Sequence, residues 1–151
     1  MPWACAHIVP RVATVAAHHN YLYRITAIYA VRDLSALFGP AASAEHLLPF
    51  VLQLAADIVP NIRFNVAKLF AAFANPPPPV PVSATSASDP AFDPATMSSF
   101  SLPPMPVVEA APWPVDLLVA HVRPALVKLS EDADGDVRFF ALQALALPSY
   151  E

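Results

Sequence analysis

Residues that commonly carry chemistry are few in this chain, and their spacing fits no familiar type of site. The chain has one cysteine, Cys5, only two glycines, and histidines at positions 7, 18, 19, 46 and 121. No HExxH pair occurs, and Cys5-x-His7 matches zinc-ligand spacing only at chance level. Two separated glycines cannot build a phosphate-binding loop, and there is no nucleophile elbow. We therefore predict a protein that is not an enzyme and that binds no metal, cofactor or small-molecule substrate.

An aspartate followed six residues later by an arginine is the more informative pattern, at Asp57–Arg63 and again at Asp132–Arg138. A carboxylate near the start of a helix accepts hydrogen bonds from free backbone N–H groups and favours the positive helix end. The arginine is placed to reach the turn of a neighbouring unit. Stacked units would form a ladder of ion pairs, each contributing about 0.5–1 kcal/mol if exposed. We favour this structural role over direct contact with a partner.

These pairs belong to a longer segment, Leu47–Phe70, that the chain contains three times. It aligns without gaps on the residues 39 positions earlier and on those 75 positions later. The positions that keep their residue type in all three copies are a proline (Pro10, Pro49 and Pro124) and an arginine (Arg24, Arg63 and Arg138). A period near 40 with a helical apolar pattern is the signature of a HEAT or armadillo array. The predicted fold is therefore all-α, an α-α superhelix (HEAT/armadillo-type solenoid) of three helical hairpins.

Each repeat is predicted to be two helices joined by a tight turn. In the first hairpin we expect helices over residues 4–17 and 21–38, the second ended by Gly39-Pro40. Ser43 is the expected N-cap of the second hairpin and Asp136 that of the last helix. The proline inside each first helix removes a backbone donor and should bend that helix. The expected core stripe of the second hairpin comprises Leu47, Leu48, Val51, Leu52, Ala55, Ile62, Val66, Leu69, Phe70 and Phe73.

Residues 75–112 interrupt the repeats. This segment is rich in proline, serine and alanine, lacks lysine and arginine, and has no helical period. We predict a disordered or polyproline-like insertion between repeats one and two (1–74) and repeat three (113–151). Its PxxP spacings lack the flanking basic residue that SH3 ligands usually have, which favours a linker. A translated intron or a gene-model error is the alternative explanation, because the repeat phase resumes cleanly after the segment.

The composition limits the possible partners. Hydrophobic residues make up 56% of the chain and charged residues 13%, and the net charge is −4. So little polar surface indicates that part of the chain contacts a protein neighbour, and the absence of a basic field argues against nucleic acid. No apolar run reaches the ~18 uncharged residues that a membrane span needs. Pro10 and Arg11 interrupt the apolar stretch near the start, so we expect no secretory signal, and the single cysteine fits a reducing compartment. We expect a cytoplasmic protein, with the nucleus as a second location.

The order proline, aspartate at +8 and arginine at +14 looks like the HEAT consensus. Three stretches carry the resemblance further: Asn20–Arg24, Asn61–Lys68 and Asp134–Ala141. They closely resemble the last three HEAT repeats of the scaffolding (A, 65-kDa type) subunit of type 2A serine/threonine protein phosphatase. The likeness covers roughly residues 3–74 and 114–147. It implies a non-catalytic scaffold fragment whose repeats form a ridge with their internal turns, and this ridge would bind the phosphatase catalytic subunit.

Carried over by the resemblance, the turn ridge comprises Asn20, Tyr21, Arg24, Val59, Asn61, Arg63, Asp134, Asp136 and Arg138. His18 stands where the family has a turn aspartate, so one rung of the ladder is lost or becomes sensitive to pH. The earlier repeats, which hold a regulatory subunit in that family, have no counterpart in this sequence. Two alternatives stay open: a generic HEAT/armadillo adaptor with another client, and a truncated product without function.

Overall fold

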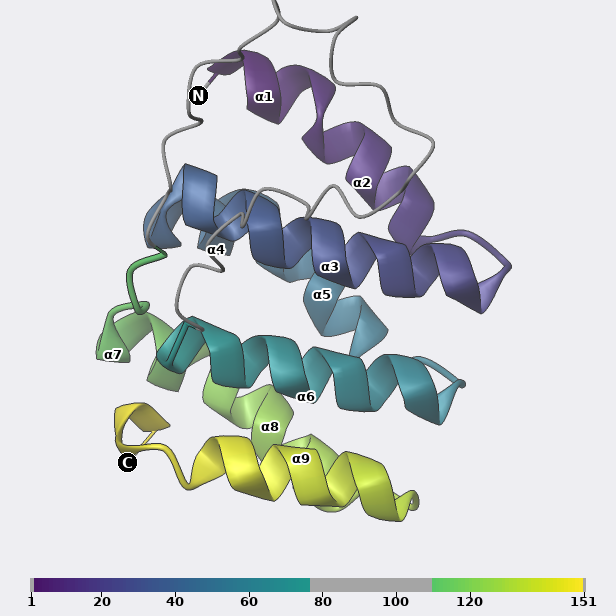
Figure 1. Cartoon of the computed structure of the whole chain (residues 1–151), viewed down its shortest axis with the longest axis vertical. Coiled ribbons are helices and arrows are strands. Elements are labelled where there is room, and N and C mark those ends of the chain that lie inside the picture. Colours follow the sequence, from purple (N-terminus) through teal and green to yellow (C-terminus); the bar gives the residue numbers. More distant parts are fainter. Residues whose placement is uncertain (1, 77–109, 151) are drawn as a thin grey trace, which may run out of the picture.

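The computed structural model describes residues 2–76 and 110–150, and all regular structure in this part of the chain is helical. Two layers of helices stack along the longest axis of the molecule (Figure 1). In chain order the elements are α1 (Pro2–His7), α2 (Val9–Ala16), α3 (Tyr21–Phe38), α4 (Pro40–His46), α5 (Leu48–Leu54), α6 (Pro60–Ala74), α7 (Val115–Leu117), the π-helical η2 (Leu118–Val122), α8 (Arg123–Ser130), α9 (Gly135–Leu145) and the 3-10 helix η3 (Pro148–Tyr150).

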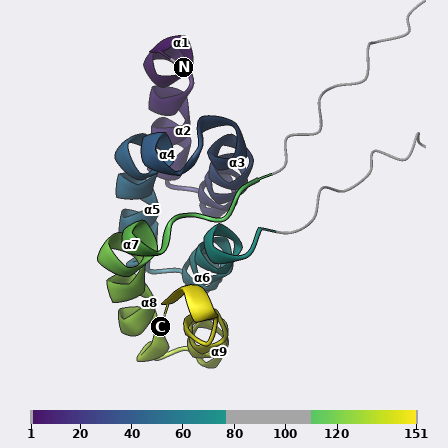
Figure 2. The same ribbon diagram turned by 90° about the vertical axis from the view of Figure 1, so that its left-hand side faces the viewer.

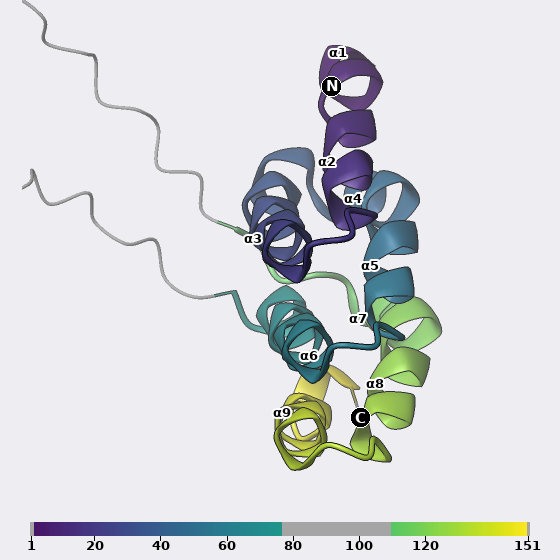
Figure 3. The same cartoon turned by 90° about the vertical axis from the view of Figure 1, so that its right-hand side faces the viewer.

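The helices form three stacked hairpins, as predicted. The first consists of α1 to α3, the second of α4 to α6, and the third of α7 to α9. Figure 3 shows α2, α5 and α8 in one column and α3, α6 and α9 in the other. The turns that lead into α3, α6 and α9 lie at the same edge of the stack (Figure 1). Equivalent residues of the three repeats are therefore brought to one side of the molecule.

The first helix of every hairpin is broken next to its proline. Pro10, Pro49 and Pro124 are each the second residue of their helix, in α2, α5 and α8. A proline has no N–H to donate, and its ring crowds the preceding turn, so the helix before it cannot run on regularly. In the first two hairpins a separate helix, α1 or α4, ends just before the break, and in the third the π-helical turn η2 absorbs it. The sequence predicted a bend at each proline; the structure instead divides the first helix of the first two hairpins in two and places a π-helical turn before Pro124 in the third.

Gly39 both ends α3 and caps α4. Its φ of +77° with ψ of 168° is a conformation that is open almost only to glycine. Pro40 then starts α4 directly, so the prediction that Ser43 is the N-cap is wrong. Ser43 lies inside α4, is completely buried, and its Oγ has no hydrogen-bond partner in the described part of the chain.

Asp134 caps the last helix, and the prediction that Asp136 does so is wrong. The Oδ1 atom of Asp134 accepts hydrogen bonds from the N–H groups of Asp136 (3.0 Å) and Val137 (3.2 Å). Because Gly135 is already the first helical residue, the capping position falls one place before it. Asp136 lies in the first turn of α9, where its charge still favours the positive helix end.

The hydrophobic core runs between the two layers. In the expected stripe of the second hairpin, only Leu52 and Ala55 are half-buried, and the others are buried. Tyr150 closes the third hairpin: it is 1% exposed, its hydroxyl donates to the carbonyl oxygen of Phe70 at 2.6 Å, and burial raises its pKa. No helix among residues 2–76 and 110–150 has the length and apolar character needed to cross a membrane.

The third hairpin stacks directly on the second although 77–109 intervene in the sequence (Figure 2). The rings of Phe73 and Trp113 lie face to face, with centroids 4.0 Å apart and planes at 11°, and the Trp113 N–H donates to the Phe73 carbonyl at 2.8 Å. Trp113 is 5% exposed. The predicted disordered insertion, 75–112, falls mainly on 77–109, which lie outside the described residues.

Candidate functional site

A repeated contact between an arginine and a carboxylate holds the turns in register. Arg24 donates through Nε and Nη2 to both carboxylate oxygens of Asp57, at 2.7 and 3.0 Å. Arg63 makes the same pair of hydrogen bonds to Asp132, both at 2.7 Å. This bidentate geometry is the most favourable one for an arginine and a carboxylate. The predicted ladder is present, and each arginine reaches the turn of the following hairpin.

The remaining arginine nitrogen, Nη1, binds the turn of its own hairpin. In the first repeat Arg24 donates to the carbonyl oxygens of residues 18 and 19 at 2.8 and 2.9 Å. In the second repeat Arg63 donates to the carbonyl oxygen of residue 57 at 2.7 Å. Arg138 donates to the carbonyl oxygens of residues 132 and 133 at 2.7 and 2.9 Å. The three arginines therefore occupy equivalent places along one edge.

The aspartates have two roles at once. While accepting from an arginine, Asp57 and Asp132 each also accept a hydrogen bond from the N–H group two residues on, at 2.9 Å. In the first hairpin His18 fills this position, and its Nδ1 accepts from the N–H of Asn20 at 3.1 Å. The histidine therefore closes its own turn, but it offers no carboxylate to a neighbouring arginine.

The ladder is more buried than the sequence led us to expect. The side chains of Arg24 and Asp57 are 11% and 9% exposed, and those of Arg63 and Asp132 are 15% and 12% exposed. The expectation of exposed pairs is thus wrong, because the stacked turns cover them. The hydrogen bonds from Arg63 lower the pKa of Asp132 although burial acts in the opposite direction, and the pKa of Arg63 is raised. Removing either partner would leave a charge with little access to water.

Six of the nine predicted ridge residues are half-buried in the protein. Arg24 and Arg63 are held in the ladder. Asn20 and Asp134 are helix caps; the Oδ1 of Asn20 accepts from the Leu22 N–H at 3.0 Å. Val59 and Asn61 lie in the second turn, where the Oδ1 of Asn61 accepts from the Asn65 amide at 2.8 Å. The other three, Tyr21, Asp136 and Arg138, are exposed at the edge. The structure thus separates residues that hold the turns together from residues whose side chains are exposed at the edge.

Sequence reasoning missed Ile58, which is 90% exposed at the tip of the second turn. The equivalent tips of the other turns, His19 and Ala133, are exposed as well. A signal was available, because Ile58 is a large apolar residue in a turn and is out of phase with both helical stripes. Such a side chain cannot reach the core from the tip of a turn.

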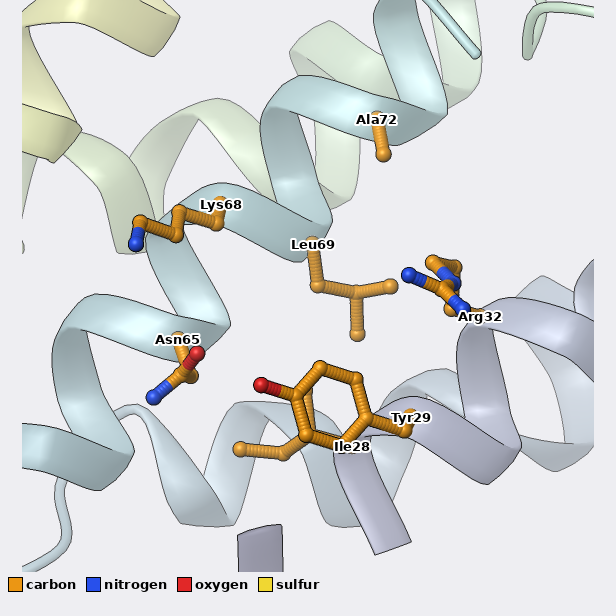
Figure 4. Close-up of a pocket in the computed structure, with 7 residues that line it drawn as sticks. All are labelled: Ile28, Tyr29, Arg32, Asn65, Lys68, Leu69 and Ala72. Carbon is orange, nitrogen blue, oxygen red and sulfur yellow. The ribbon is translucent and has the colours of Figure 1, made fainter. Parts of the chain in front are cut away.

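A groove lies between α3 and α6 (Figure 4). Its cations are already engaged: the Nζ of Lys68 lies 4.1 Å from the ring centre of Phe140, and Arg32 donates to Asp33 at 3.0 Å. Within the described residues no group of three or more histidine, cysteine or acidic side chains is placed to hold a metal. The turn ridge is therefore the stronger candidate site.

Two curated proteins, both named as the A-type regulatory subunit of protein phosphatase PP2A, are similar to this chain. It is 31% identical over 127 residues to the one from Saccharomyces cerevisiae, over 84% of this chain and 15% of the relative. It is 41% identical over 63 residues to the one from Schizosaccharomyces pombe, over 42% of this chain and 11% of the relative. No protein-family model matches the chain. The chain is related to the PP2A A-type regulatory subunit.

The relationship to the PP2A A-type regulatory subunit identifies the three hairpins as HEAT repeats and the stack as a HEAT-type solenoid. The chain spans less than a sixth of the length of either relative, the shares being 15% and 11%. By their names the relatives are regulatory subunits, which agrees with a helical-repeat scaffold.

Proposed function

We propose that this chain is a non-catalytic HEAT-repeat scaffold whose turn ridge binds the catalytic subunit of a type 2A protein phosphatase. The observation that supports this most is the ladder, which fixes three turns at one edge. An edge that is rigid before binding loses little conformational entropy on association. The partner follows from the relatives, whose names make them regulatory subunits of the phosphatase PP2A.

In this proposal the ridge residues divide the work. Arg24 and Arg63 position the turns and do not touch the partner. The exposed contact group, Tyr21, Ile58 and Asp136, faces it. Tyr21 is 41% exposed and Ile58 is 90% exposed, so both have apolar surface to bury in an interface. Aromatic and large apolar anchors of this kind supply most of the binding energy in protein interfaces.

The test is capture of purified PP2A catalytic subunit by the immobilised chain. We expect Tyr21→Ala combined with Ile58→Asp to weaken binding by about tenfold or more, because interface anchors contribute roughly 2 kcal/mol or more each. Leu37→Asp is the matched control. It changes an apolar side chain that is 57% exposed but lies at the far end of α3, away from the turns.

Circular dichroism and thermal unfolding should be the same for these variants, because all three positions are exposed. Unchanged capture by the Tyr21→Ala, Ile58→Asp variant would remove the proposed contact group. Failure of the unmodified chain to bind the catalytic subunit would favour a HEAT adaptor with a different client.

A further inference from the structure

We infer that the outer face of the third hairpin is a docking surface for a helical hairpin of another protein that carries an aspartate or glutamate in its turn. This end face consists of Arg138, Phe139 and Leu142, all on α9. It is separate from the exposed contact group of the turn ridge, and the inference does not depend on phosphatase binding.

The repeats themselves show what the end face is built to contact. The residues equivalent to Leu142 are Ile28 in α3 and Ala67 in α6. They are 2% and 0% exposed, and their helices pack against α6 and α9 of the following hairpins. In the third repeat Leu142 is 56% exposed and Phe139 is 60% exposed. The face that stacks on a neighbour in repeats one and two is thus presented uncovered in repeat three.

Phe139 repeats an aromatic contact position. Its equivalent in α6, Phe64, packs on Phe140 of the next hairpin with ring centres 5.6 Å apart. The end face therefore offers the same aromatic contact beside the same arginine position.

Arg138 supplies the polar half of the contact. Its Nη1 binds the carbonyl oxygens of its own turn, in the same way as Nη1 of Arg24 and Arg63. Those two arginines use Nε and Nη2 to grip the carboxylate of the next turn. In Arg138 these two nitrogens have no hydrogen-bond partner among the described residues. A carboxylate in the turn of an incoming hairpin matches this arrangement in charge and geometry.

Among the residues that the structure describes, neither this chain nor a second copy of it presents a turn carboxylate that is free to meet Arg138. At the equivalent turn position a second copy has His18, whose Nδ1 is used by its own turn. The chain beyond α9 turns back toward the second hairpin, where Tyr150 donates to the carbonyl of Phe70 and accepts from Nε of Arg123 at 2.9 Å. The proposed occupant is a hairpin of a different protein, whose turn carries the carboxylate.

The probe for this face is the chain itself with His18→Asp. An aspartate at 18 can accept from the same N–H group as His18 does, as Asp57 and Asp132 do in their turns. We expect the His18→Asp chain to associate head to tail in sedimentation equilibrium, while the unmodified chain does not. Adding Arg138→Ala should weaken this association by about tenfold or more. Adding Arg32→Ala, an equal change of charge on α3, should leave it unchanged.

A mixing experiment separates the two faces. Unmodified chain supplies only Arg138, and the His18→Asp, Arg138→Ala chain supplies only the carboxylate, so an equimolar mixture should form a 1:1 complex and nothing larger. Far-UV circular dichroism verifies that each variant is folded. Absence of both the self-association and the 1:1 complex, or association that is equally strong without Arg138 or without Asp at 18, would overturn the inference.

Discussion

Arg63 connects two turns of the molecule through one side chain. Its guanidinium binds the carboxylate of Asp132 in the third hairpin and the carbonyl oxygen of Asp57 in its own turn. Asp132 also accepts a hydrogen bond from the backbone N–H of Asp134. The planar guanidinium, with its donors in fixed directions, thus sets the spacing of the two turns. A lysine could not do this, because its ammonium group is a point charge without fixed donor directions.

We predict that Arg63→Ala lowers the free energy of unfolding by about 2–3 kcal/mol, between the values for exposed and fully buried pairs. The reason is that Asp132, whose side chain is 12% exposed in the intact pair, loses the arginine that donates to both of its carboxylate oxygens. The matched control, Arg138→Ala, should cost less than about 1 kcal/mol, because that arginine is exposed and holds no carboxylate among the described residues. Urea unfolding followed by circular dichroism measures both values.

The pH dependence of this difference tests its ionic origin. The pKa of Asp132 is lowered in the folded protein, so the stability it contributes is present above the unfolded pKa of about 3.9. That contribution is lost as pH falls through the still lower folded pKa. The cost of Arg63→Ala should therefore be constant near neutral pH and shrink below about pH 4. A cost that stays the same at low pH would mean that the arginine acts through packing alone.

The sequence predicted which residues pair but not how deeply they lie. The six-residue interval between aspartate and arginine, repeated in phase, was enough to place Arg63 beside Asp132. Burial of the pair depends on how closely neighbouring turns approach, and no local pattern encodes that distance. The exposure of Ile58 could have been predicted from its position outside both helical stripes.

At the scale of helices, the apolar pattern and the Gly39-Pro40 pair predicted a helix around Tyr21–Phe38, where α3 lies, and the prolines predicted a bend in each first helix. The sequence prediction misplaced the start of α4, because we expected a loop between Gly39 and Ser43. A glycine at positive φ reverses the chain in a single residue, so no loop is needed. The backbone conformation of one residue, rather than the helical pattern, decided this boundary.

Gly39→Ala should therefore lower the free energy of unfolding by about 1–3 kcal/mol, the usual cost of forcing a side chain into that region. The cost comes from the positive φ and not from a lack of space, because an added Cβ would meet no atom within 4 Å. Gly135→Ala is the control: it lies in the first turn of α9 without a positive φ, and its Cβ would lie 3.8 Å from Nη2 of Arg138. That change should be neutral or stabilise by up to about 1 kcal/mol. Equal losses for the two variants would contradict the role given to Gly39.

At the scale of the whole molecule, the second hairpin is the centre of a short linear array. Its α6 packs against both α3 and α9, and the ladder passes through its turn in both directions. In such arrays stability is approximately the sum of the repeats and the contacts between neighbours. The sequence predicted three equivalent repeats, but the direct stacking of the third on the second rests on contacts, such as Phe73 with Trp113, that the repeat phase does not contain.

The contact between Phe73 and Trp113 brings together two residues that are far apart in the sequence. The free energy of unfolding should therefore depend on the length of the chain between them. We predict that replacing 77–109 with about six glycine and serine residues raises the free energy of unfolding by about 1 kcal/mol. The chain between Phe73 and Trp113 shortens about threefold, and the cost of loop closure falls with the logarithm of length. Urea unfolding measures the change, and doubling the segment instead should cost about 0.6 kcal/mol. If shortening instead lowered the free energy of unfolding by much more than this, residues within 77–109 would have to stabilise the stack directly. A segment that acts only through the entropy of loop closure cannot have such an effect.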